Sequence, residues 1–474
     1  MSRKKNGPAS NFPAIVYVAA GIAAIAGILF GFDTGIISGA ILFIVNDFSL
    51  SSAQESLAVS MVLIGAVAGA ASGGLLAQRL GRRRSIIAAS LVFLVGTAIV
   101  VFSPELRMFL VGRLVIGAAI GIASFIGPMY ISEVSPKRIR GGMVSLNQLM
   151  ITVGILLSYV VSLFFAPSAN WRAMFLVGMV PAAILLVGIS IMPSSPRWLV
   201  FKGRTAEASQ VIRRFLGPAV PDPEVETSVA EMESRIKAQR GTKLSELFSP
   251  QVKMATLIGV GLAILQQATG VNTVIYYAPT IFQFAGLSTA ATAISASVIV
   301  GAINVVFTVV SIVLVDRLGR RPLLLVSLSG MIIALLGLGG AFMGSPQGGN
   351  LGTLAVILLM VYIASFAVGL GPIFWLLISE IYPLRVRGPA MSLATVANWT
   401  SNLIISITFL GLVDLLGKSG VFFLYAAIGI IAWSFVWRLV PETKNVSLEE
   451  IEKRIEAERE HRPKEGVKTR GGEY

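Results

Sequence analysis

The chain of 474 residues contains no cysteine and a single histidine, His461. The lack of cysteine excludes disulfides and thiol chemistry, and one histidine near the end of the chain argues against histidine-based metal sites and acid–base catalysis. Charged residues are also scarce, because they form 13% of the chain against about 25% in soluble domains. No cluster of acidic residues lies in the apolar segments, so we expect no enzyme activity, no metal and no cofactor.

Long apolar runs stand where charge is missing. Hydrophobic residues form 55% of the chain, in continuous runs such as 57–77 and 354–370 that lack the alternation of barrel strands. A bilayer offers no water to the backbone, so such runs predict membrane-spanning helices and an all-α integral membrane protein. Twelve spans are predicted, at residues 13–45, 54–77, 84–103, 106–129, 142–166, 171–192, 252–285, 290–315, 322–344, 351–380, 388–414 and 420–440.

Positive charge is concentrated in the loops at one end of these spans. The net charge is +14, and arginine-rich loops occur at 79–84, 137–140, 317–321 and 385–387. The opposite loops contain only Arg107, Arg172 and Lys418. The positive-inside rule therefore predicts that both termini are cytoplasmic, and it accounts for the charge without a nucleic-acid partner.

The sequence repeats itself across its two halves. The segment ISEVSPKRIRG at 131–141 recurs as ISEIYPLRVRG at 378–388, and RLGRR at 79–83 recurs at 317–321. Parallel halves joined by a linker are the architecture of the major facilitator fold, in which substrate binds between the bundles. We therefore predict four parts: a six-helix bundle at 1–192, a cytoplasmic helical linker at 193–250, a second six-helix bundle at 251–440 and a cytoplasmic tail at 441–474.

Four motifs make the comparison with known families specific. They are GFDTGIISG at 31–39, GR at 112–113, QQATGVN at 266–272 followed by YY at 276–277, and PETK at 441–444. The ordered set resembles the sugar porter family of the major facilitator superfamily over residues 14–450. The resemblance implies a monosaccharide carrier that functions as a monomer, and the compact loops and lack of cysteine favour a bacterial inner membrane.

Two positions depart from the family's pattern. Gln78 replaces the usual acidic residue before Arg79, and Ser194 replaces a glutamate after the sixth span. Both lie at cytoplasmic salt-bridge networks of the resembling family. We therefore expect the inside gate to be held closed less strongly.

A sugar needs amide side chains for its hydroxyls and aromatic faces for its apolar side. Residues at positions that bind sugar in the resembling family are Gln148, Gln266, Gln267, Asn272, Asn304, Trp375 and Asn398, and Phe30 and Phe366 are further candidates to line the cavity. A regular helix would not direct Gln266 and Asn272 to one point, so Gly270 between them predicts a local distortion. The alternative for each amide is ordinary hydrogen bonding between helices.

Asp33 is an acidic residue inside the first apolar span, where a charge is costly and functional by default. The resemblance implies that it pairs with Arg113 and takes up a proton, because facilitative carriers commonly have a neutral residue there. Protonation would neutralise Asp33, loosen Arg113 and allow the bundles to move. The alternative is a structural ion pair that fixes helix packing.

Two further groups are predicted to act as gates. Tyr276 and Tyr277 resemble the family's extracellular gate. The predicted cytoplasmic gate consists of charged residues near the cytoplasmic helix ends, mostly at equivalent positions of the two repeats, which would pair when that side is closed: Arg82, Glu133, Arg140, Asp316, Arg320, Glu380 and Arg387.

The predicted function is monosaccharide import by proton symport, with the sugar and the proton as ligands and the bilayer as surroundings. A facilitative uniporter of the same fold is one alternative, against which Asp33 argues. A sugar sensor that binds without useful flux is another. Such receptors tend to carry long signalling tails, and the tail here is short.

Overall fold

The structure is a computed structural model that describes residues 12–136, 138–217, 220–239, 244–250, 252–343, 351–383 and 385–444. The regular elements in these ranges are helices, so the predicted all-α class is confirmed. The N-terminal residues 1–11 and the predicted tail from residue 445 onward lie outside the described part of the chain.

Six predicted spans of the first half are present as helices. Their bounds are α1 (Ala14–Asp47), α2 (Ser52–Arg79), α3 (Arg82–Val101), α4 (Leu106–Val134), α5 (Arg140–Phe165), and the pair α6 (Trp171–Val177) and α7 (Met179–Ile191), with the short η1 (Ala166–Ser168) after α5. The predicted span 171–192 is present as the single candidate span Trp171–Ile191, in which the regular helix is interrupted at Gly178. Small residues bring these helices together, because a Cβ on Gly117 would lie 1.9 Å from the Val62 carbonyl oxygen of α2.

The helices of the second half are more often interrupted. They are α11 (Lys253–Ala268), α12 (Val271–Tyr276), α13 (Ala278–Phe284), α14 (Ala290–Leu318), α15 (Arg320–Met343), α16 (Leu351–Val368), α17 (Leu370–Ile381) and α18 (Arg387–Leu439). The predicted span 252–285 is interrupted near Gly270, as expected, and again near Tyr277, and the predicted span 351–380 is interrupted at Gly369. Glycines with non-helical backbone angles cause two of these breaks.

The helix α18 covers two predicted spans. The described residues contain 11 helices long and apolar enough to cross a membrane, and α18 alone has 53 residues. A straight helix of that length would measure about 80 Å, far more than the bilayer core. Gly417 interrupts it with φ 72° and ψ 168°, between the predicted spans 388–414 and 420–440. The break therefore supplies the twelfth predicted crossing.

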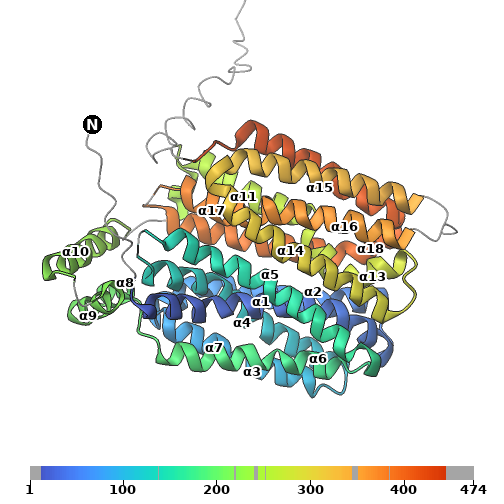
Figure 1. The fold of residues 1–474 in the computed structure, drawn as a ribbon, viewed down its shortest axis with the longest axis horizontal. Coiled ribbons are helices and arrows are strands. Elements are labelled where there is room, and N and C mark those ends of the chain that lie inside the picture. Colours follow the sequence, from blue (N-terminus) through green and yellow to red (C-terminus); the bar gives the residue numbers. More distant parts are fainter. Residues whose placement is uncertain are drawn as a thin grey trace, which may run out of the picture.

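The helices of both halves run roughly along the long axis, and the two halves lie beside each other across it (Figure 1). They touch through α2 with α18, α5 with α14, and α1 with α12 and α13. The polar segment between them forms α8 (Pro196–Phe201), α9 (Thr205–Leu216), α10 (Asp222–Gln239) and η2 (Leu244–Phe248), and α8 to α10 project at one end (Figure 1). We call the end with Arg82, Arg140, Arg320 and Arg387 the basic end and the other the opposite end.

Candidate functional site

Four amide side chains form one hydrogen-bonded cluster beside the break between α11 and α12. Asn398 donates through Nδ2 to Gln266 Oε1 at 2.8 Å, and Gln267 donates through Nε2 to Asn398 Oδ1 at 3.2 Å. Asn272 donates through Nδ2 to Gln267 Oε1 at 2.8 Å. Gln266 in turn donates to the Leu370 carbonyl of α17 at 2.8 Å. Four of the seven residues predicted from sugar-binding positions are thus in mutual contact.

The backbone at Gly270 makes this cluster possible. Gly270 has φ +87°, a left-handed conformation, and a Cβ there would lie 2.5 Å from the Tyr425 ring. The interrupted helix leaves the Thr269 carbonyl in need of a partner, and the Tyr362 hydroxyl donates to it at 2.9 Å. The local distortion predicted between Gln266 and Asn272 is therefore present in the structure.

The remaining predicted substrate residues do not join this hydrogen-bond network in the described structure. Gln148 is half-buried on α5, and Asn304 is buried on α14 with its Oδ1 atom unpaired among the described residues. Trp375 is 36% exposed and packs edge-on against Phe374, with ring centroids 4.8 Å apart. Phe366 is half-buried on α16 and lies against Gly371.

Two residues that the sequence analysis did not single out also lie here, both on α18. Trp399 packs against Phe30 of α1 with ring centroids 5.1 Å apart, which joins the two halves. Asn402 donates through Nδ2 to the Tyr276 hydroxyl at 3.2 Å. Asn402 follows Asn398 by one helical turn, so helical spacing on this face would have indicated it.

Asp33 and Arg113 form the buried ion pair that the sequence suggested. Arg113 Nη1 lies 2.5 Å from Asp33 Oδ1, and the side chains are 0% and 4% exposed. The guanidinium carbon of Arg113 lies 5.6 Å from the centre of the Phe175 ring, and its Nε and Nη2 atoms have no hydrogen-bond partner among the described residues. A buried pair of this kind leaves an uncompensated charge when either partner is removed.

The two predicted gate tyrosines lie at the junction of the halves. Tyr276 and Tyr277 are 1% and 0% exposed. The ring of Tyr277 lies 4.9 Å from the ring of Phe409, centre to centre. Both tyrosines are therefore packed inside the molecule, where Tyr277 contacts α18 of the same half.

The charged residues at the basic end form contacts within each half. Arg82 of α3 pairs with Glu133 of α4 at 2.7 Å, and Arg320 of α15 pairs with Glu380 of α17 at 2.8 Å. Each pair joins two helices of the same half, so these bonds do not themselves tie the halves together.

The other predicted members of this group brace the neighbouring loops. Arg140 donates to the Ser135 carbonyl and Arg387 to the Tyr382 carbonyl, each at 3.1 Å through Nη2. These equivalent bonds close the short loops before α5 and α18. The side chain of Asp316 lies outside the described part of the structure.

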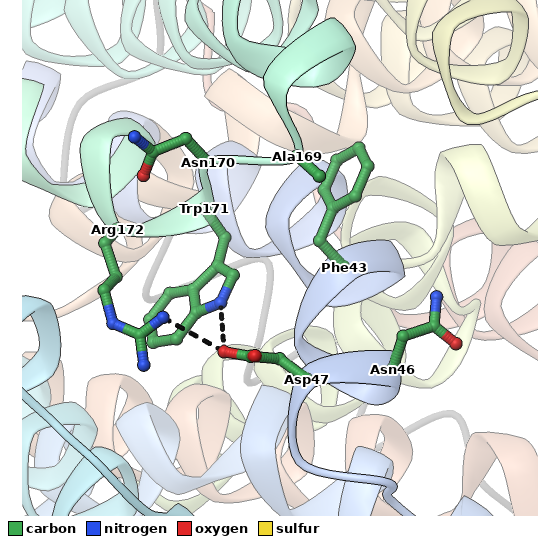
Figure 2. A pocket seen from close by; sticks show the side chains of 7 residues that line it. All are labelled: Phe43, Asn46, Asp47, Ala169, Asn170, Trp171 and Arg172. Atoms are coloured by element: carbon green, nitrogen blue, oxygen red, sulfur yellow. Dashed lines mark hydrogen bonds and ion pairs between the residues drawn. The ribbon is translucent and has the colours of Figure 1, made fainter.

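A pocket of about 380 Å³ lies at the opposite end, apart from the amide cluster. It is lined by Phe43, Asn46, Asp47, Ala169, Asn170, Trp171 and Arg172 (Figure 2). Asp47 Oδ2 accepts hydrogen bonds from Trp171 Nε1 and Arg172 Nη1, each at 3.0 Å (Figure 2). The pocket shares no residue with the predicted substrate site.

An aromatic cluster connects this pocket to the buried ion pair. Trp171 packs edge-on against Phe109 with ring centroids 5.7 Å apart, and Phe109 packs against Phe175 at 6.0 Å. Phe175 in turn lies under Arg113. Apolar rings therefore separate the guanidinium from the pocket.

Comparisons with known proteins agree on one family. The family model described as "Sugar (and other) transporter" matches residues 19–454. The arabinose-proton symporter of Escherichia coli (strain K12) is 38% identical over 438 residues, covering 92% of this chain and 92% of that protein. The glucose transporter GlcP of Staphylococcus epidermidis is 40% identical over 431 residues, covering 91% of this chain and 95% of that protein.

A solved structure is also similar. The xylose transporter XylE from E. coli, in a partially occluded inward open conformation, matches with a TM-score of 0.81 and 32% identity over 92% of this chain and 100% of that chain. A second structure of XylE, described as a major facilitator superfamily proton:xylose symporter, matches with a TM-score of 0.80. The chain therefore belongs to the sugar transporter family of the major facilitator superfamily and is a membrane transport protein, not an enzyme.

Proposed function

We propose that the protein imports a monosaccharide together with a proton by opening a central site alternately to the two sides of a membrane. The observation that carries this proposal is the buried Asp33–Arg113 ion pair, which lies in the membrane-spanning part of the first half. The second half contributes a cluster of amide side chains. The similarity to an arabinose-proton symporter supports it. We place the basic end in the cytoplasm because its loops carry the positive charge.

The amide cluster suits a ligand rich in hydroxyl groups. Gln266, Gln267 and Asn398 satisfy one another in this structure, so sugar binding exchanges internal hydrogen bonds for bonds to hydroxyls at little net cost. Asn304 Oδ1 is buried and unpaired among the described residues, and it offers a further acceptor. The ring of Phe30, with Trp399 beside it, supplies an apolar face.

The remaining predicted sugar ligands complete this assignment. Gln148 on α5 and Asn272 on α12 add amides from both halves, and Trp375 and Phe366 add rings from α17 and α16. A site with ligands on both halves gives the sugar different contacts when the halves move, as an alternating mechanism requires.

The ion pair would couple the proton to movement. When Asp33 is ionised, its carboxylate holds Arg113 of α4 against α1. A proton on Asp33 removes that attraction and leaves the guanidinium over the Phe175 ring. The two states of Asp33 therefore favour different arrangements of α1 and α4, and uptake of sugar and proton becomes linked.

The test is uptake of labelled arabinose, xylose, glucose and galactose into proteoliposomes, with and without an inward proton gradient. Asp33→Asn keeps the size of the side chain but removes the titratable group. We expect this variant to lose accumulation against a gradient while it retains sugar exchange. Asp47→Asn is the matched control on the same helix, because its carboxylate pairs with Arg172 in an exposed bridge. We expect it to accumulate sugar as the parent does.

Other outcomes select the alternatives. Uptake that ignores both the proton gradient and Asp33→Asn would identify a uniporter. Sugar binding without flux would identify a sensor, and in both cases symport would be rejected.

A further inference from the structure

Tyr159 forms a buried hydrogen bond that crosses between the two halves. Its hydroxyl, on α5, donates to the carbonyl oxygen of Ile275, on α12, at 2.9 Å. The Tyr159 side chain is buried, and it lies in the half of α5 nearer the opposite end. The bond therefore ties the first half to the second half toward the opposite end.

The Ile275 carbonyl is available because of a proline. In a continuous helix it would accept the N–H of residue 279, four positions later. Residue 279 is a proline, which has no N–H, and the helix is interrupted between α12 and α13. A carbonyl group left without a hydrogen bond inside a membrane protein costs free energy, so a donor from another helix stabilises it. Tyr159 supplies that donor.

A glycine on the second half makes room for the ring of Tyr159. A Cβ on Gly301 of α14 would lie 3.0 Å from Tyr159 Cδ2, tighter than ordinary contact, and 3.3 Å from Leu156 Cα. The helices α5 and α14 therefore approach closely at this point. The second half thus provides both an acceptor for the hydroxyl and space for the ring.

We propose that Tyr159 is a latch that holds the opposite end closed, with the Ile275 carbonyl freed by Pro279 as its acceptor. This inference rests on the proposed function, because a latch matters only if that end opens. The bond exists when the halves meet and is replaced by water when they separate, so it is a contact that distinguishes the two states. Tyr159 is a positioning residue, and it acts through the gate.

The absence of native cysteine allows a direct test with one introduced thiol. Ile294→Cys places the thiol on α14, where the parent side chain is 0% exposed and faces Gly39 of α1 across the junction. The rate of maleimide labelling of the purified protein then reports opening of that end. We expect Tyr159→Phe, which removes only the hydroxyl, to raise this rate about fivefold, the effect of losing one buried hydrogen bond.

Two companion variants separate the latch from general damage. Tyr130→Phe removes a hydroxyl that donates to the Pro193 carbonyl at 2.8 Å, within the first half and the adjoining linker, so we expect no change in labelling. Pro279→Ala returns an N–H to compete for the Ile275 carbonyl. We expect this variant to raise labelling as well, and to have no further effect when combined with Tyr159→Phe.

Unchanged labelling in Tyr159→Phe and Pro279→Ala would overturn the latch, as would an equal increase in Tyr130→Phe. Sugar uptake by the parent is measured separately. If the parent transports no sugar but Tyr159→Phe still speeds labelling, the latch stands and the transport proposal fails. If uptake is normal and labelling is unchanged, the latch alone fails.

Discussion

The repeated sequence places one glutamate of each half at the basic end, and each accepts hydrogen bonds from an arginine and a hydroxyl. In the first half, Arg82 donates to Glu133 at 2.7 Å, and the Ser195 hydroxyl donates to the other carboxylate oxygen. The equivalent partners of the second half are Glu380, Arg320 and Thr443. The repeat thus builds the same cluster twice.

The N-terminal ends of the equivalent helices α3 and α15 are stabilised in different ways. The Glu442 carboxylate accepts the backbone N–H groups of Arg320 and Arg321, each at 3.0 Å, and so caps the start of α15. The equivalent of Glu442 in the first half is Ser194, and α3 begins at Arg82, after Gly81, without a side-chain cap. The departure at Ser194 therefore removes a helix cap and leaves the Arg82–Glu133 pair intact.

The transmembrane helices differ between the halves as well. The helix α1, which carries Asp33, is continuous over 34 residues. The corresponding segment of the second half is divided into α11, α12 and α13, and it carries three of the four clustered amides. The first half thus presents its ion pair from unbroken helices, and the second half presents amides where a helix is interrupted.

The largest expected effect on sugar binding comes from removing that interruption. Gly270→Ala would force a side chain into left-handed backbone and into the Tyr425 ring. We expect it to displace the amides and to weaken sugar binding at least about tenfold, a loss of about 1.4 kcal/mol. Gly21→Ala is the control, because a Cβ on that residue of α1 meets nothing within 4 Å. If calorimetry shows that the two variants bind sugar equally well, the helix break in the second half is not needed to present the amides.

A second effect, on stability and not on sugar binding, should distinguish the two glutamates. The Glu133 side chain is 5% exposed and that of Glu380 is 25% exposed. Removing one partner of a buried ion pair costs up to about 3–5 kcal/mol, whereas exposed pairs contribute under about 1 kcal/mol. We therefore expect Glu133→Gln to lower the thermal unfolding midpoint more than Glu380→Gln. The exposed Glu207, which pairs with Arg204, serves as the control through Glu207→Gln. The reverse order would show that burial does not set the difference.

The smallest effect concerns the cap on α15 and depends on pH. Burial raises the pKa of Glu442, but the backbone N–H groups of Arg320, Lys444, Arg321 and Thr443 together outweigh it and hold the pKa below its ordinary value. The stabilisation is therefore complete above the unfolded pKa of about 4.3 and is lost as pH falls through the lowered folded-state value.

The variant that tests this cap is Glu442→Gln. We expect it to lower the free energy of unfolding at pH 7 by about 1 kcal/mol. The difference from the parent in the thermal unfolding midpoint should shrink as the pH is lowered from 5 toward 3. A difference that stays constant over this range would mean that the charge of Glu442 does not contribute.

Much of the fold was predictable because it depends on local properties. Hydropathy located the spans, since apolar runs of this length are stable as helices only in a bilayer. The position of Gly270 between Gln266 and Asn272 predicted the break in the seventh span. The additional breaks at Tyr277 and Gly369 were missed, because hydropathy does not register how a backbone turns within an apolar run.

The partners of individual side chains were less predictable. The Asp33–Arg113 pair was expected from the family resemblance, whereas the contact of Phe30 with Trp399 was not. Nor did the sequence indicate that Gln148 and Trp375 would stay apart from the amide cluster in this state. Contacts of this kind join helices distant in the chain, and they depend on how the two halves are docked.

By itself, the sequence determined that this protein is a helical membrane protein built from two repeats, with an acid in its first span and amides beside a glycine in its seventh. Tertiary structure alone decided that the Tyr159 hydroxyl meets the carbonyl freed by Pro279, and that Glu442 caps α15. The physical reason is one of range. Apolar length and backbone hydrogen bonding act within a helix, while an orphan carbonyl or helix end takes whichever donor or acceptor packing brings within about 3 Å.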